Sequence, residues 1–393
     1  MNEKKSLVLT IAVTAVATAL LTSAVKDIAY IKTGGEGLQK MSAVKNMLTE
    51  YSLYEVDEEK VSDYASMAMA AAVDDPYTAY YTEEEFSSFR DNLVSSYVGV
   101  GALIGADAES DRLVVVSCFE DSPADKAGLK SGDIFLEIDG EMYDASQLNE
   151  AAIHMKSGEV GSTVAVTVQR EGKGNLDIEI MRDAVIKKSV KSEMVTADSG
   201  YIRITGFESK SETNQKDTYD EFCEHLEGLK GAGMRKLIID LRDNPGGDLN
   251  VVCKIADKLL PEGIITYTED KRGKRETISS DAEETDIPIA VLVNGGSASA
   301  SEVLTGALKD YKKATVIGET TFGKGIVQTV YPFSDGSGIS ITTAKYYTPS
   351  GVCIHDVGIE PDIEVLPDSD KRIAELSVSE DTQLKKAIEV LSQ

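Results

Sequence analysis

The sequence predicts a multidomain protein of mixed α/β fold, and three features support this class. The chain has 393 residues, more than one ordinary domain requires, so we expect two or three folded units. Apolar residues first recur at helical spacing, and from Tyr97 onward they follow the two-residue period of strands. Beyond residue 195, apolar strands alternate with helical segments, which is the pattern of a layered α/β sheet, and a β-hairpin is expected around Lys271-Arg272-Gly273.

Charge and composition exclude several classes of function. The formal net charge is −27 at pH 7, which argues against nucleic acid as a partner because such proteins need a basic surface. Hydrophobic residues make up 42% of the chain, enough for a packed core. The 3 histidines and 4 cysteines show no metal-ligand spacing, so we expect neither a metal nor a cofactor.

Residues 1–26 read as a targeting segment. Lys4 and Lys5 precede an apolar run over residues 7–25, which is long enough to cross the hydrocarbon core of a bilayer. The basic residues favour an orientation with the short end inside the cell. We favour a retained single-pass anchor in the cell membrane; the alternative is a cleaved signal peptide and a secreted or periplasmic protein. Both place the body of the chain outside the cytoplasm.

Helical spacing of apolar residues predicts a helical segment over residues 36–93. Thr82 and Glu85 have the spacing of a capping box at the start of its last helix. Met41 and Met69 belong to a methionine stripe that we interpret as core or helix–helix contact, and we expect this segment to form a homodimer. Residues 369–393 predict a C-terminal helical tail that packs with these N-terminal helices.

Residues 97–183 carry a second pattern. The run SPADKAGLKSGDIFLEIDG, residues 122–140, resembles a PDZ domain, a β-sandwich-like barrel with helices. The resemblance implies a module that captures the C-terminal ends of proteins or peptides. Glycines in the preceding loop free its N–H groups to turn toward a carboxylate. The peptide-binding residues implied are Val98, Gly99, Val100 and Gly101.

Two stretches carry the candidate chemistry. Residues 294–303, NGGSASASEV, place serines 297, 299 and 301 at the start of a helix, directly after an apolar strand. Residues 318–328, GETTFGKGIVQ, place Lys324 in a glycine-flanked turn. A helix N-terminus offers backbone N–H groups to an oxyanion, and a buried lysine can lose its proton and act as a base. These properties indicate a hydrolase, but they leave open which serine reacts; close packing or N-capping is the alternative for each.

The lysine turn also comes close to the phosphate-binding loop of nucleotide hydrolases. Gly325 stands where that loop needs a serine or threonine, and the residues that follow, IVQTVY, predict a strand instead of a helix. We therefore reject the nucleotide-binding alternative.

Taken together, NGGSASASE, FGKG, DLRDNPGG and YYTPSGVCIHDVGIEPDIEV resemble the C-terminal processing, or tail-specific, peptidases, a serine–lysine endopeptidase family. The resemblance covers about residues 36–366 and implies a crotonase-like α/β protease core over residues 195–366. The patch Cys353-x-His355 departs from the family pattern. The residue roles that the resemblance implies are nucleophile Ser299, base Lys324, lysine-orienting Gln328, oxyanion donors Gly246 and Ala300, and supporting residues Glu302 and Asp310.

We therefore expect a serine endopeptidase that cleaves extracytoplasmic proteins with accessible C-termini, with a PDZ domain that gates the active site. The alternative is a PDZ-based binding or scaffold protein with an inactive core. Ser299, Lys324 and Gln328 are all present, whereas an inactive relative would be free to lose them.

Overall fold

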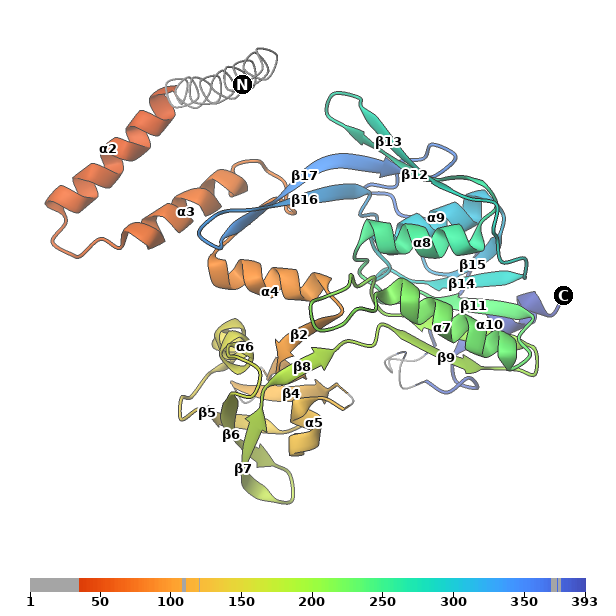
Figure 1. Cartoon of the computed structure of the whole chain (residues 1–393), viewed down its shortest axis with the longest axis horizontal. Helices are drawn as coiled ribbons and strands as arrows, with labels where there is room; N and C mark the ends of the chain where they lie inside the picture. Colours follow the sequence, from red (N-terminus) through yellow and green to blue (C-terminus); the bar gives the residue numbers. More distant parts are fainter. Residues whose placement is uncertain (1–34, 108–110, 120, 369–372, 374–375) are drawn as a thin grey trace, which may run out of the picture. The chain divides into compact units, whose positions relative to one another are not determined.

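The computed structural model describes residues 35–107, 111–119, 121–368, 373 and 376–393, and the chain divides into two compact units between Ala72 and Val73 (Figure 1). The predicted membrane segment, residues 7–25, lies outside the described residues. Among the helices that are described, none combines the length and the hydropathy that crossing a bilayer requires.

The first unit contains two helices, α2 (Gly35–Tyr51) and α3 (Glu58–Ala71). The Asp57 side chain caps α3 by accepting the N–H of Lys60. Several large apolar side chains of these helices are exposed, among them Leu38, Met41, Val44, Met47, Leu48 and Met69. The methionine stripe, which we expected in a core or a helix–helix contact, is therefore exposed to solvent when this unit is considered by itself.

The remainder of the predicted helical segment belongs to the second unit. Residues Ala79–Tyr81 form strand β1, which pairs antiparallel with β17 (Gly338–Tyr347). Helix α4 (Glu83–Leu93) follows, and its predicted capping box is confirmed: Thr82 and Glu85 exchange side-chain-to-backbone hydrogen bonds. The last part of the predicted helical segment 36–93 is therefore a strand followed by a capped helix.

The predicted PDZ domain is a five-stranded antiparallel sheet with two helices and a separate two-stranded ribbon, β2–β8. The sheet order is β3-β4-β5-β6-β7, so β3 lies at an edge. Its core is filled by alternating residues of the strands, such as Val164, Val166 and Val168. The elements are β2 (Ser96–Gly99), β3 (Ala102–Asp107), β4 (Arg112–Cys118), α5 (Pro123–Ala127), β5 (Ile134–Ile138), α6 (Leu148–Lys156), β6 (Thr163–Arg170), β7 (Gly174–Met181) and β8 (Asp183–Ile186).

The protease core is built on a six-stranded sheet of order β18-β15-β14-β11-β10-β9. All neighbours pair in parallel except β9 and β10. Carboxyl ends of parallel strands meet at one edge, which is where sites of open α/β sheets form. The strands are β9 (Val190–Met194), β10 (Ser199–Ile204), β11 (Lys236–Asp240), β14 (Ile289–Val293), β15 (Ala314–Gly318) and β18 (Ile363–Glu364).

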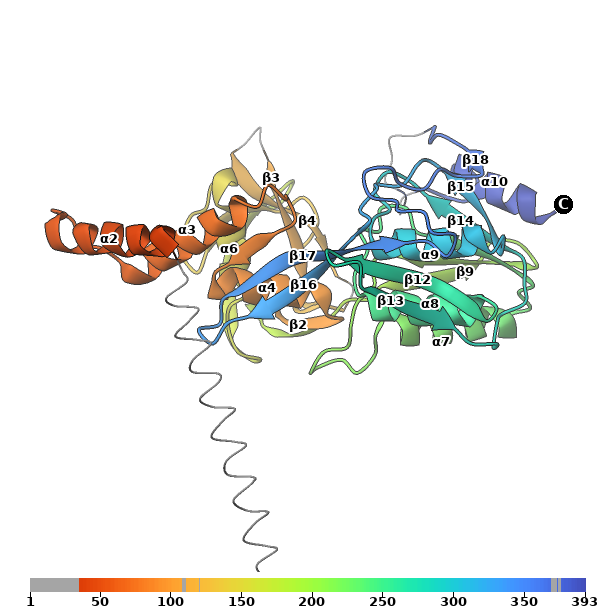
Figure 2. The same ribbon diagram turned by 90° about the horizontal axis from the view of Figure 1, so that it is seen from above.

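Helices cover both faces of this sheet (Figure 2). Helices α7 (Thr218–Gly231), α8 (Leu249–Leu259) and α9 (Ala300–Asp310) share one large hydrophobic core with one face. The C-terminal helix, α10 (Thr382–Leu391), packs Leu384 and Ala387 against the other face. The expectation that the tail packs with the N-terminal helices is therefore wrong: its apolar stripe instead fills the open face of the core sheet.

A second sheet lies alongside the core and carries the predicted lysine-orienting residue. Its order is β1-β17-β12-β13, and β16 (Ile326–Pro332) pairs with β17. Strands β12 (Gly263–Asp270) and β13 (Arg275–Ser280) form the hairpin that the sequence predicts around residues 271–273. Gln328 lies on β16, next to a shift in the register between β16 and β17.

Candidate active site

The backbone at Ser299 is strained. Ser299 is the residue before α9, and its φ of 55° and ψ of −115° lie in a region that residues with a side chain rarely adopt. Its N–H donates to Glu302 Oε2 at 2.8 Å, which holds the strained turn in place. Such strain persists only where surrounding contacts determine it, and it concentrates at functional sites.

The other two serines of the SASAS stretch have structural roles. Ser297 is fully buried, and its hydroxyl donates to the carbonyl of Leu241 at 2.8 Å. Ser301 is also fully buried and donates to the carbonyl of Asn244 at 2.9 Å. Ser299 is half-buried and lines a cleft. Burial and hydrogen bonding therefore distinguish the three serines, whereas the sequence pattern alone left open which of them reacts.

Lys324 lines the same cleft and lies at the end of the loop before β16. Its amine donates to Gln328 Oε1 at 3.0 Å, and the Gln328 amide in turn donates to the carbonyl of Tyr77 at 2.5 Å. The amine also lies 4.6 Å from the centre of the Tyr77 ring. Burial lowers the pKa of Lys324, and the carboxylate of Asp75 opposes part of that shift.

Close packing requires a glycine beside the lysine. A Cβ on Gly325 would lie 2.4 Å from the backbone nitrogen of His355, so any side chain there would displace the turn that contains His355. The Cys353-x-His355 patch, noted as a departure from the family pattern, thus forms part of the wall behind the lysine turn.

Glu302 joins the serine turn to the lysine turn. It is fully buried, and its two carboxylate oxygens accept four hydrogen bonds. The donors are the N–H groups of Ser299, Gly323 and Lys324 and the hydroxyl of Thr321. A buried carboxylate is stable only when it is satisfied in this way, so Glu302 acts as a positioning residue.

Asp310, the other predicted supporting residue, lies at the far end of α9. It is exposed and accepts the N–H of Ser350 at 2.8 Å, which fastens the turn after β17. It is not among the residues that line the cleft. Tyr346 supports the site instead: its hydroxyl oxygen lies 2.9 Å from the Ser299 carbonyl oxygen and 2.6 Å from the Lys324 carbonyl oxygen.

The two predicted oxyanion donors come together beside Ser299. A Cβ on Gly246, whose φ is +108°, would lie 2.9 Å from Ser299 Cβ and 3.0 Å from the nitrogen of Ala300. Only glycine fits this approach. The Gly246 N–H itself donates to Asn244 Oδ1 at 2.8 Å, so this donor is already engaged in the structure.

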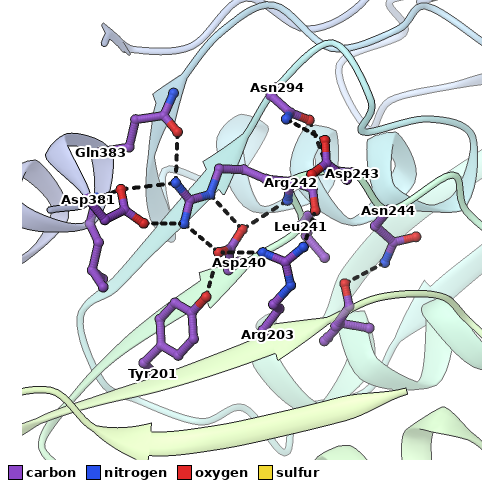
Figure 3. A network of polar contacts seen from close by, with 12 residues as sticks. Tyr201, Arg203, Asp240, Leu241, Arg242, Asp243, Asn244, Asn294, Asp381 and Gln383 are labelled. Carbon is purple, nitrogen blue, oxygen red and sulfur yellow. Dashed lines mark hydrogen bonds and ion pairs between the residues drawn. The ribbon is translucent and has the colours of Figure 1, made fainter. Parts of the chain in front are cut away.

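An ionic network anchors the strand end that precedes this glycine loop (Figure 3). The buried guanidinium of Arg242 bonds both oxygens of Asp240 and both oxygens of Asp381, with distances of 2.6–3.0 Å. Gln383 accepts from it at 2.8 Å. Burial by itself raises the pKa of Asp240, but Arg242 and Arg203 outweigh it and hold that pKa below its ordinary value.

A polar bridge connects the glycine loop to the serine loop. Asn294 Oδ1 accepts the N–H of Asp243 at 2.9 Å, and its amide donates to Asp243 Oδ1 at 2.8 Å (Figure 3). Sequence reasoning missed the roles of Arg242, Asn244, Asn294 and Tyr77, and it missed the hydrogen bonds that Thr321 and Gly323 donate to Glu302. The signal for Arg242 was present, since an arginine between two aspartates directly after a buried strand requires a charged partner.

The cleft has a volume of about 590 Å³, and apolar residues form much of its wall. Ser299, Ala300, Gly246, Lys324 and Gln328 all line it. Within the part of the chain that the structure describes, the Lys324 amine bonds Gln328 and makes no hydrogen bond to the Ser299 hydroxyl. The cleft is therefore lined by a serine, a lysine of lowered pKa and the N-terminus of a helix. The serine hydroxyl and the lysine amine are not hydrogen-bonded to each other in this structure.

The predicted peptide-binding residues differ in what they do. Val98 and Gly99 belong to β2 and pair with Ala184 and Asp183 of β8. Val100 lines a second hollow, of about 780 Å³, between β3 and α6 of the PDZ domain. The N–H of Phe119 and the hydroxyl of Ser122 both donate to the carbonyl of Gly101.

Comparison with known families agrees with this architecture. Residues 198–365 match the model of peptidase family S41, and residues 101–180 match the PDZ domain. Among solved structures, a photosystem II D1 C-terminal processing protease is 31% identical with a TM-score of 0.51, covering 83% of this chain and 87% of that chain. An S41 protease from Bacteroides fragilis shares the fold at 16% identity, with a TM-score of 0.56 and 90% and 96% coverage.

Curated relatives extend the match over most of the sequence. The carboxy-terminal processing protease CtpA of Bacillus subtilis (strain 168) is 34% identical over 339 residues, covering 86% of this chain and 71% of the relative. A CtpA-like serine protease of Staphylococcus aureus (strain COL) is 35% identical over 364 residues, covering 89% of this chain and 71% of the relative. The chain therefore belongs to peptidase family S41, and the predicted enzyme class, a serine-type C-terminal processing protease, is confirmed.

Proposed function

We propose that Ser299 is the nucleophile, that Lys324 is the general base and that Gln328 orients the lysine. The observation that supports this most is the shared cleft: Ser299 and Lys324 line it together, whereas Ser297 and Ser301 are buried and bonded to backbone carbonyls. The lowered pKa of Lys324 favours the neutral amine that a base must be.

In the proposed reaction, the neutral Lys324 amine takes the hydroxyl proton of Ser299 while Oγ attacks the peptide carbonyl carbon. The resulting ammonium gives that proton to the leaving amine, the C–N bond breaks and an acyl-enzyme remains. A water then attacks the ester carbonyl, Lys324 accepts a proton from this water, and Oγ leaves and is protonated again. The chain's own side chains supply every proton transfer in this sequence.

The active state requires two local changes from the present arrangement. The Lys324 amine, still held by Gln328, moves within reach of the Ser299 hydroxyl, and the Gly246 N–H turns from Asn244 toward the oxyanion, beside the N–H of Ala300. The first change is a rotation of the lysine side chain, and the second is a rotation of the peptide unit at a glycine. We infer that the structure corresponds to a resting state from which the site assembles.

We further propose that the substrates are extracytoplasmic proteins with accessible C-termini, captured by the PDZ domain. The match to the PDZ model and the names of the C-terminal processing relatives support this substrate class. Gating of the active site by the PDZ domain is part of the proposal. Deletion of residues 97–183 is expected to change cleavage of long substrates; equal rates on long and short substrates before and after deletion would remove the gating.

Residues 7–25 are proposed to anchor the chain in the cell membrane, and the segment 36–93 is proposed to form a homodimer. The apolar run supports the first proposal, and the exposed side chains of α2 support the second. Fractionation of cells tests the anchor, and release of the chain by alkaline carbonate would contradict it. Sedimentation of residues 35–393 tests the dimer, and a monomer at micromolar concentration would contradict it.

The experiment that tests the dyad compares Ser299→Ala and Lys324→Ala on an unstructured protein with an apolar C-terminus. Both variants are expected to lose cleavage by at least about a thousandfold. The matched controls, Ser279→Ala and Lys345→Ala, remove an exposed serine and an exposed lysine of neighbouring strands and are expected to cleave like the parent. Full cleavage activity in both variants would contradict the Ser299–Lys324 dyad. A parent protein that binds peptide tails but does not cleave them would support the alternative, a scaffold protein with an inactive core.

A further inference from the structure

A turn over residues 74–78 lies beside the lysine amine of the proposed dyad. It directly precedes β1, at the start of the second compact unit. Tyr77 makes two contacts there: its carbonyl accepts the Gln328 amide at 2.5 Å, and the centre of its ring lies 4.6 Å from the Lys324 amine. Among the described residues, those that line the active-site cleft do not include Tyr77. We therefore expect its ring to affect cleavage through the lysine and not through contact with a substrate.

Hydrogen bonds to β17 and within the turn hold Tyr77 in this place. The Asp75 carboxylate accepts the N–H of Tyr77 at 3.1 Å and the hydroxyl of Thr78 at 2.6 Å. Thr78 is buried, and its hydroxyl oxygen accepts the N–H of Thr342 on β17 at 3.2 Å. Pro76 restricts the backbone at its own position. Because β17 also pairs with β16, the same sheet carries the turn and the strand on which Gln328 lies.

The Tyr77 carbonyl determines which way the Gln328 amide points. A carbonyl oxygen can only accept a hydrogen bond, so Gln328 Nε2 faces Tyr77 and Gln328 Oε1 faces the Lys324 amine. The amine donates an N–H to Oε1 at 3.0 Å, and this contact leaves the lone pair of a neutral amine free. With the amide turned over, its NH₂ group would donate to that lone pair, and the amine could not accept a proton. The turn thus keeps the lysine available as a base.

The Tyr77 ring acts on the protonated form of the same amine. A cation within about 6 Å of the centre of an aromatic ring is attracted to the negative face of that ring. At 4.6 Å, the ring therefore favours the ammonium form of Lys324. An ammonium is what Lys324 becomes when it takes the proton of Ser299, so the ring stabilises this charge at the moment it forms.

The other titratable groups around Lys324 make different contacts. Glu302 of α9 accepts the Lys324 N–H, and the Tyr346 hydroxyl of β17 lies 2.6 Å from the Lys324 carbonyl oxygen. His355, on the turn behind the lysine, interacts electrostatically with Asp75. Burial lowers the pKa of Lys324, and the Asp75 carboxylate opposes that decrease. Exchange of the aromatic ring for an apolar side chain changes none of these charges, so the effect of the ring can be measured separately.

We propose that Tyr77 is a positioning residue for the catalytic base, and that its ring stabilises the ammonium which Lys324 becomes during cleavage. The proposal rests on the proposed Ser299–Lys324 dyad. It adds to the site a residue that lies outside residues 198–365, the part of the chain that matches the peptidase family. The turn between the first unit and β1 is therefore part of the catalytic machinery.

The test compares three full-length variants with the parent in cleavage assays over a range of pH. Tyr77→Phe keeps the ring and is expected to cleave within about twofold of the parent. Tyr77→Leu keeps an apolar side chain without an aromatic face; its kcat is expected to fall about tenfold at unchanged KM. Because the ammonium loses its support, the rise of the rate is expected to move to lower pH by roughly half a unit or more.

The third variant carries pentafluorophenylalanine at position 77. This side chain keeps the shape of phenylalanine but loses the negative face of the ring, so the same displacement to lower pH is expected relative to Tyr77→Phe. Its packing matches that of the Phe variant closely, so it tests the ring even where Tyr77→Leu does not fold. Tyr331→Leu exchanges an exposed tyrosine of β16, the strand that carries Gln328, and is expected to cleave like the parent.

Two results overturn the proposal. A pH profile of the fluorinated variant that coincides with that of Tyr77→Phe shows that the face of the ring has no effect on the amine. A displacement to higher pH in Tyr77→Leu shows that the ring acts only by excluding water. Ser299→Ala and Lys324→Ala are measured in the same assay: their loss of cleavage beside an unchanged pH profile of the Tyr77 variants separates failure of this proposal from failure of the dyad.

Discussion

The carboxylate of Glu302 accepts the backbone N–H of Ser299 at 2.8 Å, through the same oxygen that accepts the N–H of Lys324 at 2.9 Å. One buried side chain therefore sets the positions of both proposed catalytic residues. The positive φ of Ser299 persists because this contact and the start of α9 determine it together.

Glu302→Gln is expected to lower the free energy of unfolding by about 2–4 kcal/mol, because an amide nitrogen would face N–H donors in a buried site. Cleavage is expected to fall by at least about a hundredfold, since the serine and the lysine lose their common support. Urea denaturation and single-turnover cleavage measure the two effects. Glu360→Gln changes an exposed carboxylate and is the control; wild-type cleavage by Glu302→Gln would contradict the positioning role.

The rate of cleavage is expected to rise with pH as Lys324 loses its proton, at a pH below the ordinary lysine pKa of 10.5. Asp75→Asn removes the charge that opposes the shift, so the rise is expected to move to lower pH. Gln328→Glu places a carboxylate beside the amine and is expected to move it to higher pH. A pH profile of single-turnover rates tests both directions, and displacement of the two profiles in the same direction would contradict Lys324 as the base.

Lys324→Met is expected to stabilise the protein at neutral pH, at the cost of activity. The folded-state pKa of Lys324 is lower than its unfolded value, so the unfolded chain binds the proton more tightly and the parent gains stability as pH rises toward 10.5. The advantage of the variant is therefore largest below the folded pKa and shrinks above it. Thermal unfolding at pH 7 and pH 10 measures this difference; an advantage that grows with pH would contradict the burial.

Asp381→Ala is expected to lower the free energy of unfolding by about 3–5 kcal/mol, because it leaves part of the buried charge of Arg242 unpaired. It also removes the cap of α10, where Asp381 accepts the N–H of Leu384. Glu389→Ala removes an exposed ion pair of the same helix and is expected to change stability by less than about 1 kcal/mol. Equal effects of the two substitutions would contradict a structural role for the Arg242 network.

Local signals in the sequence predicted most of the architecture. Strand periods, glycine turns and caps such as Thr82–Glu85 depend on neighbouring residues, so the strand–helix order of the core and the hairpin at residues 271–273 were predicted correctly. The packing of α10 was predicted wrongly, since an apolar stripe does not specify which surface it covers. The predicted helical segment 36–93 included β1, whose partner, β17, lies more than 250 residues later in the chain.

Active-site residues could be predicted from the sequence only where they belong to a recognisable motif. The SASAS and FGKG stretches indicated a reactive serine and a lysine. The choice among the three serines depends on which of them are buried: Ser297 and Ser301 are, and they bond the carbonyls of Leu241 and Asn244, which lie far away in the sequence. The engagement of Gly246 by Asn244 and the link of Gln328 to Tyr77 join parts of the chain that no local pattern connects.

Mapping the serine that a fluorophosphonate modifies tests the central claim most directly. Full-length protein is treated with a serine-directed fluorophosphonate, digested and analysed by mass spectrometry, together with Ser299→Ala and Lys324→Ala. The account predicts one adduct on Ser299 in the parent, none in Ser299→Ala and much slower labelling in Lys324→Ala. An adduct on Ser297 or Ser301, or labelling of Lys324→Ala at the rate of the parent, would contradict it.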